Sequence, residues 1–159
     1  MPVPRDAFAA AAECLCREGI TRAEPPVHPW WERRYGKAAV FCTPDQAEID
    51  LHLTLTGGYF GLAIPSDDLF SVPGEPFELA GVMMTALPLG MRLMQAAYHT
   101  VLGGGSGLRA KRDVVQLALK DGSLDEARHW AQRWRGEAVL ATAIVRSWDA
   151  LYLPHDHPA

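Results

Sequence analysis

The sequence predicts an α+β fold in which a small, mostly antiparallel sheet is combined with an N-terminal helix and a helical C-terminal half. Two patterns predict it. Residues 48–56 alternate strictly between polar and apolar side chains, as in a strand with one face in the core. From residue 89 onward, apolar side chains recur every three or four positions, as in amphipathic helices. The length of 159 residues predicts a single domain over residues 1–153, followed by a disordered tail at 154–159.

The chain is predicted to begin with a helix that Asp6 caps and that ends at Gly19. The apolar positions of this helix follow helical spacing: Phe8, Ala12, Leu15 and Cys16. Residues 24–31 contain three prolines, so a regular helix or strand is not expected there. The sequence therefore predicts a loop between the first helix and the first strand.

A β-hairpin should follow this loop. Residues 37–43 have the composition of a short apolar strand, and Pro44–Asp45 suits the central positions of a tight turn. The alternating segment 48–56 is the second strand, with four residues facing the core: Ile49, Leu51, Leu53 and Leu55. Gly57–Gly58 is expected to end the hairpin.

Beyond the hairpin the sequence predicts a short helix that starts at Ser66, an extended segment and four further helices. The extended segment covers residues 77–87. The helices are expected at residues 89–102, at residues 108–120, from Ser123 onward and at residues 137–152. Ser123 and Glu126 have the spacing of a capping box. The tryptophans of these helices, which are predicted to be core, are Trp130, Trp134 and Trp148.

Composition limits the classes of function. The net charge of −4 argues against a nucleic-acid backbone as the main partner, because phosphate groups are neutralised by a basic face. The longest apolar stretch is too short to cross a bilayer, and the first residues lack the layout of a secretory signal. Cys14, Cys16 and Cys42 lack the spacing of a metal site and are interpreted as reduced thiols. The sequence thus predicts a cytoplasmic protein without a membrane partner.

Three polar side chains share one face of the 48–56 strand: Glu48, Asp50 and His52. Alternate residues of a strand lie about 6.6 Å apart. A carboxylate in this position can hold Mg²⁺ together with a substrate phosphate. The alternative interpretation is the solvated face of a half-buried sheet. Because three ligands on one straight strand rarely converge on one octahedral ion, a metal site here needs further ligands from elsewhere.

Other polar groups allow a structural and a functional interpretation. His99 suits the C-terminal end of its helix, where the helix dipole favours a basic side chain. Arg112 is able to bind phosphate or to pair with Asp113. The tryptophans of residues 28–31 (His-Pro-Trp-Trp) either bind a ligand or partner from an exposed position or pack over the hairpin.

The order of these motifs resembles that of a known family. A helix opens after Val3–Pro4, and the sequence Glu-Ile-Asp-Leu-His follows at residues 48–52. Ala-Tyr-His at 97–99 and Arg-Asp-Val at 112–114 complete the pattern. These motifs are similar to those of the uncharacterised bacterial nucleotidyltransferase-like proteins of the polymerase-β type fold, and the likeness covers residues 6–152.

In proteins of that family, a strand just before the first helix carries two aspartates separated by one residue. Together with a third acid on a neighbouring strand, these aspartates bind two Mg²⁺ ions that align a nucleoside triphosphate. The resemblance implies that Asp50 is this third acid, catalytic and metal-binding, with His52 as its neighbour on the same face. His99, Arg112 and Asp113 match motifs of the family's helical half, whose role is mainly structural. From the residues themselves, Glu48 is the second candidate metal ligand, and His52 and Arg112 are the candidates for cofactor binding. The aspartate pair would stand directly before Val3–Pro4, where this chain has no room for it.

One acid cannot assemble a two-metal site, so this chain is expected to be nucleotidyltransferase-like but inactive or incomplete. One interpretation places the natural start upstream, which makes the longer protein a Mg²⁺-dependent nucleotidyltransferase. The alternative is a non-catalytic binding or regulatory module. Missing first strands would also leave a sheet edge unpaired, which predicts a homodimer or a protein partner at that edge.

Overall fold

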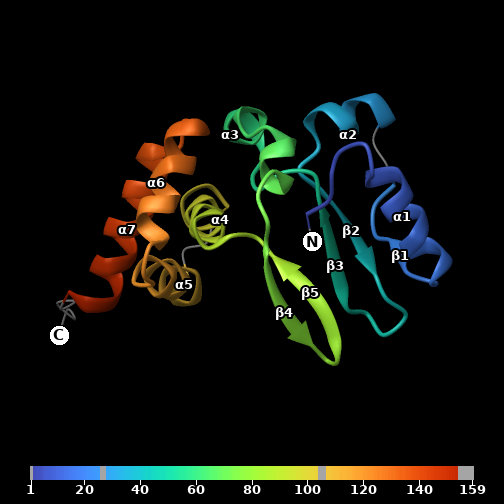
Figure 1. The fold of residues 1–159 in the computed structure, drawn as a ribbon. Coiled ribbons are helices and arrows are strands. Elements are labelled where there is room, and N and C mark those ends of the chain that lie inside the picture. The colour runs from blue at the N-terminus through green and yellow to red at the C-terminus, as the bar shows by residue number, and fades with distance from the viewer. Residues whose placement is uncertain (1, 26–27, 104–106, 154–159) are drawn as a thin grey trace, which may run out of the picture. The chain divides into compact units, whose positions relative to one another are not determined.

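The structure, a computed structural model, describes residues 2–25, 28–103 and 107–153. The chain forms two compact units, the N-terminal unit (Met1–Phe70) and the C-terminal unit (Ser71–Ala159). The predicted α+β class is confirmed, because the described residues form seven α-helices and two small antiparallel sheets (Figure 1). The single domain over residues 1–153 stays a prediction, and the predicted tail at 154–159 lies outside the described residues.

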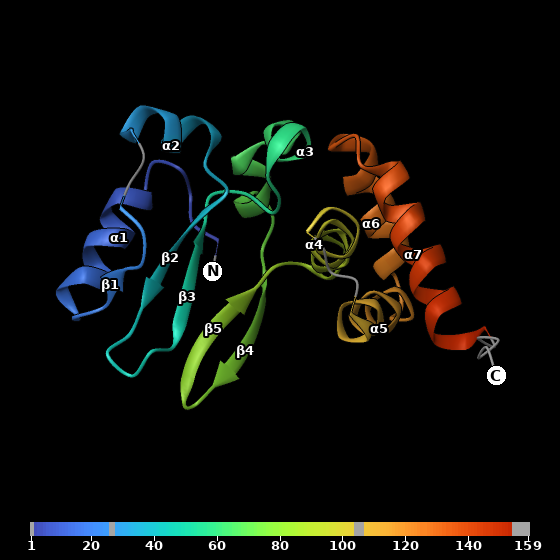
Figure 2. The ribbon, with the colours of Figure 1, turned by 180° about the vertical axis from the view of Figure 1, so that it is seen from behind.

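The N-terminal unit is built on a three-stranded antiparallel sheet with the order β1 (Thr21–Arg22), β2 (Ala38–Cys42) and β3 (Glu48–His52). The hairpin of β2 and β3 confirms the prediction, and its register pairs Ala39 with Leu51 and Phe41 with Ile49. Helix α1 (Phe8–Arg17) packs on the buried residues of this hairpin through its apolar face (Figure 2). Residues of α1 in this small core are Phe8, Ala11, Ala12 and Leu15.

Strand β3 ends at His52, four residues before the predicted end at Thr56. Beyond His52 the alternation no longer describes burial, because residues 53–56 are all buried. The carbonyl of Lys37 accepts hydrogen bonds from the N–H groups of both Leu53 (2.8 Å) and Thr54 (3.3 Å), which turns the chain away from the strand direction. The Thr54 hydroxyl then donates to the carbonyl of Gly61 at 3.2 Å.

The prediction of a loop over residues 24–31 is wrong at its end, where helix α2 (Pro29–Tyr35) begins. Proline is favourable at the first position of a helix, because its fixed φ suits the helix and no N–H is lost there. The ring Nδ1 of His28 caps this helix by accepting the N–H of Trp30 at 3.3 Å. Two further short helices complete the unit: α3 (Gly58–Ala63) and the predicted helix from Ser66, a 3₁₀ helix at Ser66–Phe70.

The C-terminal unit begins with a hairpin of β4 (Glu75–Leu79) and β5 (Val82–Ala86), where the sequence predicted one extended segment. Ala80 and Gly81 turn the chain with φ angles of 50° and 80°, as in the two-residue turns that join antiparallel strands. Four helices follow: α4 (Leu89–Leu102), α5 (Leu108–Ala118), α6 (Ser123–Arg133) and α7 (Glu137–Tyr152). These helices confirm the predicted helical half.

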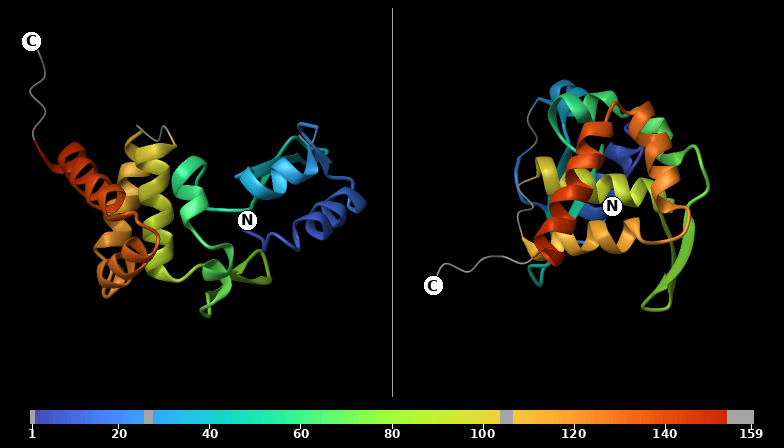
Figure 3. Two further views of the ribbon diagram at one scale, coloured as in Figure 1. Left: turned by 90° about the horizontal axis from the view of Figure 1, so that it is seen from above. Right: turned by 90° about the vertical axis from the view of Figure 1, so that its left-hand side faces the viewer.

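Helix α4 contacts each of the other three helices of this unit (Figure 3). Its buried residues include Leu93, Met94 and Tyr98. Trp130 of α6 and Trp134, which directly follows this helix, are buried, as predicted. The prediction that Trp148 is core is wrong, because its side chain is 45% exposed. A helical stripe of apolar residues does not show which of two apolar faces is buried.

The approach of α4 to α6 leaves no space for a side chain at Gly90. A Cβ atom at this position would lie 2.7 Å from the Cβ of Glu126 and 2.7 Å from the backbone nitrogen of Ala127. The N–H of Gly90 donates to the carboxylate of Glu126 at 2.9 Å. Glu126 therefore caps α4 rather than forming the predicted capping box with Ser123, and Gly122 is the N-cap residue of α6.

We predict that Gly90→Ala lowers the free energy of unfolding by about 1–3 kcal/mol, since the added methyl group pushes α4 and α6 apart. Urea unfolding followed by circular dichroism measures this change. Gly107→Ala is the matched control, because no atom lies within 4 Å of a Cβ at that position and its φ is −68°. Equal unfolding midpoints for the two variants would contradict the close approach at Gly90.

Candidate functional site

The polar strand face that was predicted to hold the metal and cofactor ligands is present on β3. Asp50 and His52 lie together, with 3.7 Å between Oδ2 of Asp50 and Nε2 of His52. Their side chains are 55% and 19% exposed, respectively. Glu48 is exposed at the start of the same strand. The structure therefore brings two of the three predicted residues into contact.

His52 is the most strongly constrained of these side chains. Its Nδ1 lies 3.3 Å from the carbonyl oxygen of Thr54. Burial lowers the pKa of His52 below its usual value, while the Thr54 carbonyl and the Asp50 carboxylate act in the opposite direction. The net lowering favours a neutral imidazole beside the Asp50 carboxylate.

The segment that leads into α1 lies directly alongside β3. Pro2 forms a parallel bridge with His52, and the N–H of Val3 donates to the His52 carbonyl at 2.9 Å. The edge of the sheet that the sequence predicted to be unpaired is thus covered at the His52 end. No further strand of the described residues pairs with this edge, so the Glu48 end remains open.

The other predicted site residues do not come together in one site. Across residues 2–25, 28–103 and 107–153, no three His, Cys, Asp or Glu side chains are close enough to hold one metal ion. The predicted metal ligands Asp50 and Glu48 thus have no third ligand among these residues. Arg112 lies on α5 in the C-terminal unit and pairs with its neighbour Asp113 at 2.9 Å, the structural alternative considered from the sequence. His99 is exposed on α4, and all three cysteines are free.

A pocket of about 420 Å³ in the N-terminal unit was not predicted from the sequence. It combines residues of three separate segments, so no local spacing reveals it. We call it the Arg5–Arg34 pocket. It is lined by Arg5, Asp6, Trp30, Arg34, Ser66 and Asp67. A volume of this size lies in the range of small-molecule sites.

The pocket carries two positive and two negative side chains, Arg5 and Arg34 with Asp6 and Asp67. Burial lowers the pKa of Arg5 from its usual value, and the nearby charge of Arg34 lowers it further. The two guanidinium groups are therefore close enough to repel each other. A bound anion between them would relieve this repulsion and form charge-assisted hydrogen bonds.

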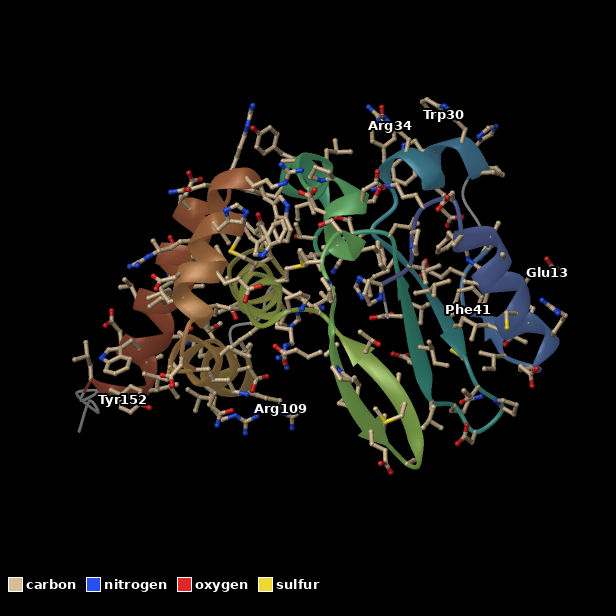
Figure 4. The ribbon with its side chains drawn as sticks, viewed as in Figure 1. Glu13, Trp30, Arg34, Phe41, Arg109 and Tyr152 are labelled. Atoms are coloured by element: carbon tan, nitrogen blue, oxygen red, sulfur yellow. The ribbon has the colours of Figure 1, made fainter. Side chains whose placement is uncertain are left out.

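Helix α2 supplies the aromatic wall of the pocket. In Figure 4 the side chains of Trp30 and Arg34 both extend outward from this helix. Trp30 is 64% exposed and Trp31 is 47% exposed, so the alternative in which both rings pack over the hairpin is wrong. Tyr35 contacts both rings, with centroid distances of 5.9 Å and 5.8 Å, and these three side chains form an exposed aromatic cluster.

Comparison with known proteins found no match to this chain. No protein family, no curated protein and no solved structure is similar to it at a significant level. Among the described helices, none has both the length and the apolar character needed to cross a bilayer.

The lowered pKa of His52 predicts a pH-dependent stability. The unfolded chain binds a proton near the usual histidine pKa of about 6.5, whereas the folded chain does so at lower pH. The contribution of His52 is therefore fully present above that pKa and is lost as the pH falls below it. We predict that His52→Gln flattens the dependence of the unfolding free energy on pH below the usual histidine pKa of about 6.5.

Urea unfolding at a series of pH values measures this slope. His99→Gln is the control, because His99 is exposed on α4. An unchanged slope in His52→Gln would show that burial of this ring does not govern its protonation.

Proposed function

We propose that this chain is a cytoplasmic, nucleotidyltransferase-like module that binds a nucleoside triphosphate in the Arg5–Arg34 pocket and does not transfer the nucleotidyl group by itself. One observation carries the proposal: a single pocket combines two guanidinium groups with an exposed indole ring. These are the groups that recognise a phosphate chain and an aromatic base.

The phosphate part of the ligand is matched by Arg5 and Arg34. Guanidinium groups bind phosphate oxygens through paired hydrogen bonds, and such bonds are about twice as strong as those between neutral groups. Arg5 is partly buried, which strengthens its interaction with an anion, since less water screens the charge. A triphosphate chain carries enough oxygens to contact both groups.

The base and sugar are matched by the other lining residues. A base stacked on an aromatic ring gains about 1–3 kcal/mol, and Trp30 is exposed enough to receive one. Asp6 and Asp67 also line the pocket, and their carboxylates accept hydrogen bonds from amino or hydroxyl groups. The same carboxylates repel an anion that brings no donors. A nucleotide therefore fits this pocket better than inorganic triphosphate.

Nucleotidyl transfer requires more metal-binding acids than this chain carries in matching positions. The family that the sequence resembles uses three acids for two Mg²⁺ ions. In this chain only Asp50 occupies a position that matches one of them. Binding without transfer is the function that this residue set supports.

We predict that Arg34→Gln weakens the binding of a nucleoside triphosphate at least tenfold. Loss of a hydrogen bond to a charged group costs about 1.5–3 kcal/mol, and about 1.4 kcal/mol corresponds to a factor of ten. Isothermal titration calorimetry with each of the four nucleoside triphosphates in the presence of Mg²⁺ measures the affinity.

Arg17→Gln is the matched control, because Arg17 is an exposed arginine at the end of α1 in the same unit. Inorganic triphosphate is the matched ligand and should bind more weakly than the nucleotide. No heat with any nucleotide, or an equal effect of the two substitutions, would reject the Arg5–Arg34 pocket as the binding site.

A second candidate function, Mg²⁺-dependent nucleotidyl transfer, is favoured by the position of Pro2 and Val3. The resemblance requires the segment just before Val3–Pro4 to lie beside the strand that carries Asp50. Pro2 pairs with His52 two residues further along that strand, which supports this arrangement. In this candidate, Asp50 and Glu48 are the metal ligands contributed by β3.

The two candidates differ in the role of Asp50. If Asp50 holds Mg²⁺, we predict that Asp50→Asn abolishes the effect of Mg²⁺ on nucleotide affinity, while Glu13→Gln, at an exposed acid of α1, leaves it unchanged. Calorimetry with and without Mg²⁺ measures this effect. If Asp50→Asn keeps the metal dependence, Asp50 is not a ligand and only the binding proposal stands.

A further inference from the structure

Helix α7 is apolar on two opposite sides. Its inner face carries the buried residues Val139, Leu140, Ala143 and Ser147. On the other side is a second apolar stripe, all of it exposed, which we call the outer stripe of α7: Ala138, Ala141, Val145, Trp148 and Tyr152. A helix with a second apolar face has the pattern of one that is covered on both sides.

The spacing of the outer stripe is that of a helix-pairing surface. Its members follow one another at intervals of three, four, three and four residues. This alternation is the heptad pattern through which two helices pack side by side. We propose that the outer stripe of α7 binds α7 of a second copy of this chain, antiparallel, across a two-fold axis at Val145.

The distribution of side-chain sizes along the stripe favours an antiparallel copy. The side chains of the stripe are small at its start, where Ala138 and Ala141 lie, and large at its end. Trp148 and Tyr152 stack there with a centroid distance of 4.5 Å (Figure 4 labels Tyr152). With Val145 on the axis, Tyr152 of one copy faces Ala138 of the other, and Trp148 faces Ala141. Each large residue thus meets a small one, as close packing requires.

A hollow beside the stripe provides space for the larger ring. It has a volume of about 370 Å³ and lies between α6 and α7, where Ala141 and Val145 form part of its wall. Leu124 and Ala131 of α6 line the opposite side. A cavity of about 150 Å³ accepts benzene, so this hollow is large enough for the indole of Trp148 of the other copy.

The area available predicts a weak dimer. Trp148 is 45% exposed and Tyr152 is 57% exposed. Since an aromatic side chain buries about 150–250 Å², the two rings contribute roughly 200 Å² for each copy. The rings of both copies thus bury about 400 Å², and with the rest of the stripe and the walls of the hollow the total stays at or below about 1,000 Å², in the size class of weak protein interfaces. We therefore expect a dissociation constant in the micromolar range.

Charge is compatible with this pairing. The outer stripe itself carries no charged residue, and the C-terminal unit contains nine basic and nine acidic residues. Arg146 and Asp149 border the same side of the stripe and are three residues apart, so an acid of its own helix lies near each Arg146 where the axis brings the two copies together. Antiparallel helices also place opposite ends of their dipoles together.

Analytical ultracentrifugation from about 10 μM to about 500 μM tests the proposal over the expected range of affinity. The unmodified chain should show a reversible monomer–dimer equilibrium. Val145→Glu should remain monomeric throughout, because two carboxylates would then face each other on the axis. Leu108→Glu is the control, since Leu108 is 62% exposed in the same unit but lies on α5, and it should still dimerise.

A mixture of Val145→Glu and Val145→Lys should dimerise again, because opposite charges then meet at the axis. A mixture of Ala141→Glu and Trp148→Lys should do so only if the helices are antiparallel. Failure of either mixture would overturn the proposed register. A chain that stays monomeric at the highest concentration, or a dimer that Val145→Glu leaves intact, would overturn the proposal itself.

Discussion

The C-terminal unit depends on the contact between α4 and α6 at Gly90. Because no side chain separates the two backbones there, the carboxylate of Glu126 reaches the first turn of α4 and accepts the N–H of Gly90. Helix α4 then lies against all three other helices and buries one face completely. The inner face of α7 is part of this packed interior, and its second apolar face is consequently left on the surface.

In the N-terminal unit the corresponding constraint is the end of β3 at His52. Two hydrogen bonds to the Lys37 carbonyl turn the chain inward, so that residues 53–56 are buried instead of extending the strand. The following short helices bring Ser66 and Asp67 to the pocket formed by Arg5 and by Arg34 of α2. The same region near His52 receives Pro2 and Val3, which places the strand face with Asp50 beside the segment that opens α1.

Both proposals rest on groups that folding leaves accessible. A small unit has a large surface for its volume and cannot bury every apolar side chain that its sequence contains. Three of the exposed aromatic residues lie on α2 and two at the end of α7, while Tyr59, Phe70 and Phe77 lie elsewhere. On α2 they stand beside arginines, which suits a ligand with an anionic group and a flat ring. On α7 they stand in a regular stripe without charge, which suits another helix.

The sequence by itself determined the elements whose signal is local. The alternation around Ile49 and Leu51 and the helical spacing over residues 89–102 set the hairpin and α4, because a period of two or of 3.6 follows from backbone geometry. Only the tertiary structure decided what depends on neighbours distant in sequence. It set the end of β3, the use of Glu126 as a cap for α4, and the exposure of Trp148. It also assembled the Arg5–Arg34 pocket, since its residues come from three segments whose spacing along the chain says nothing of their distance in space.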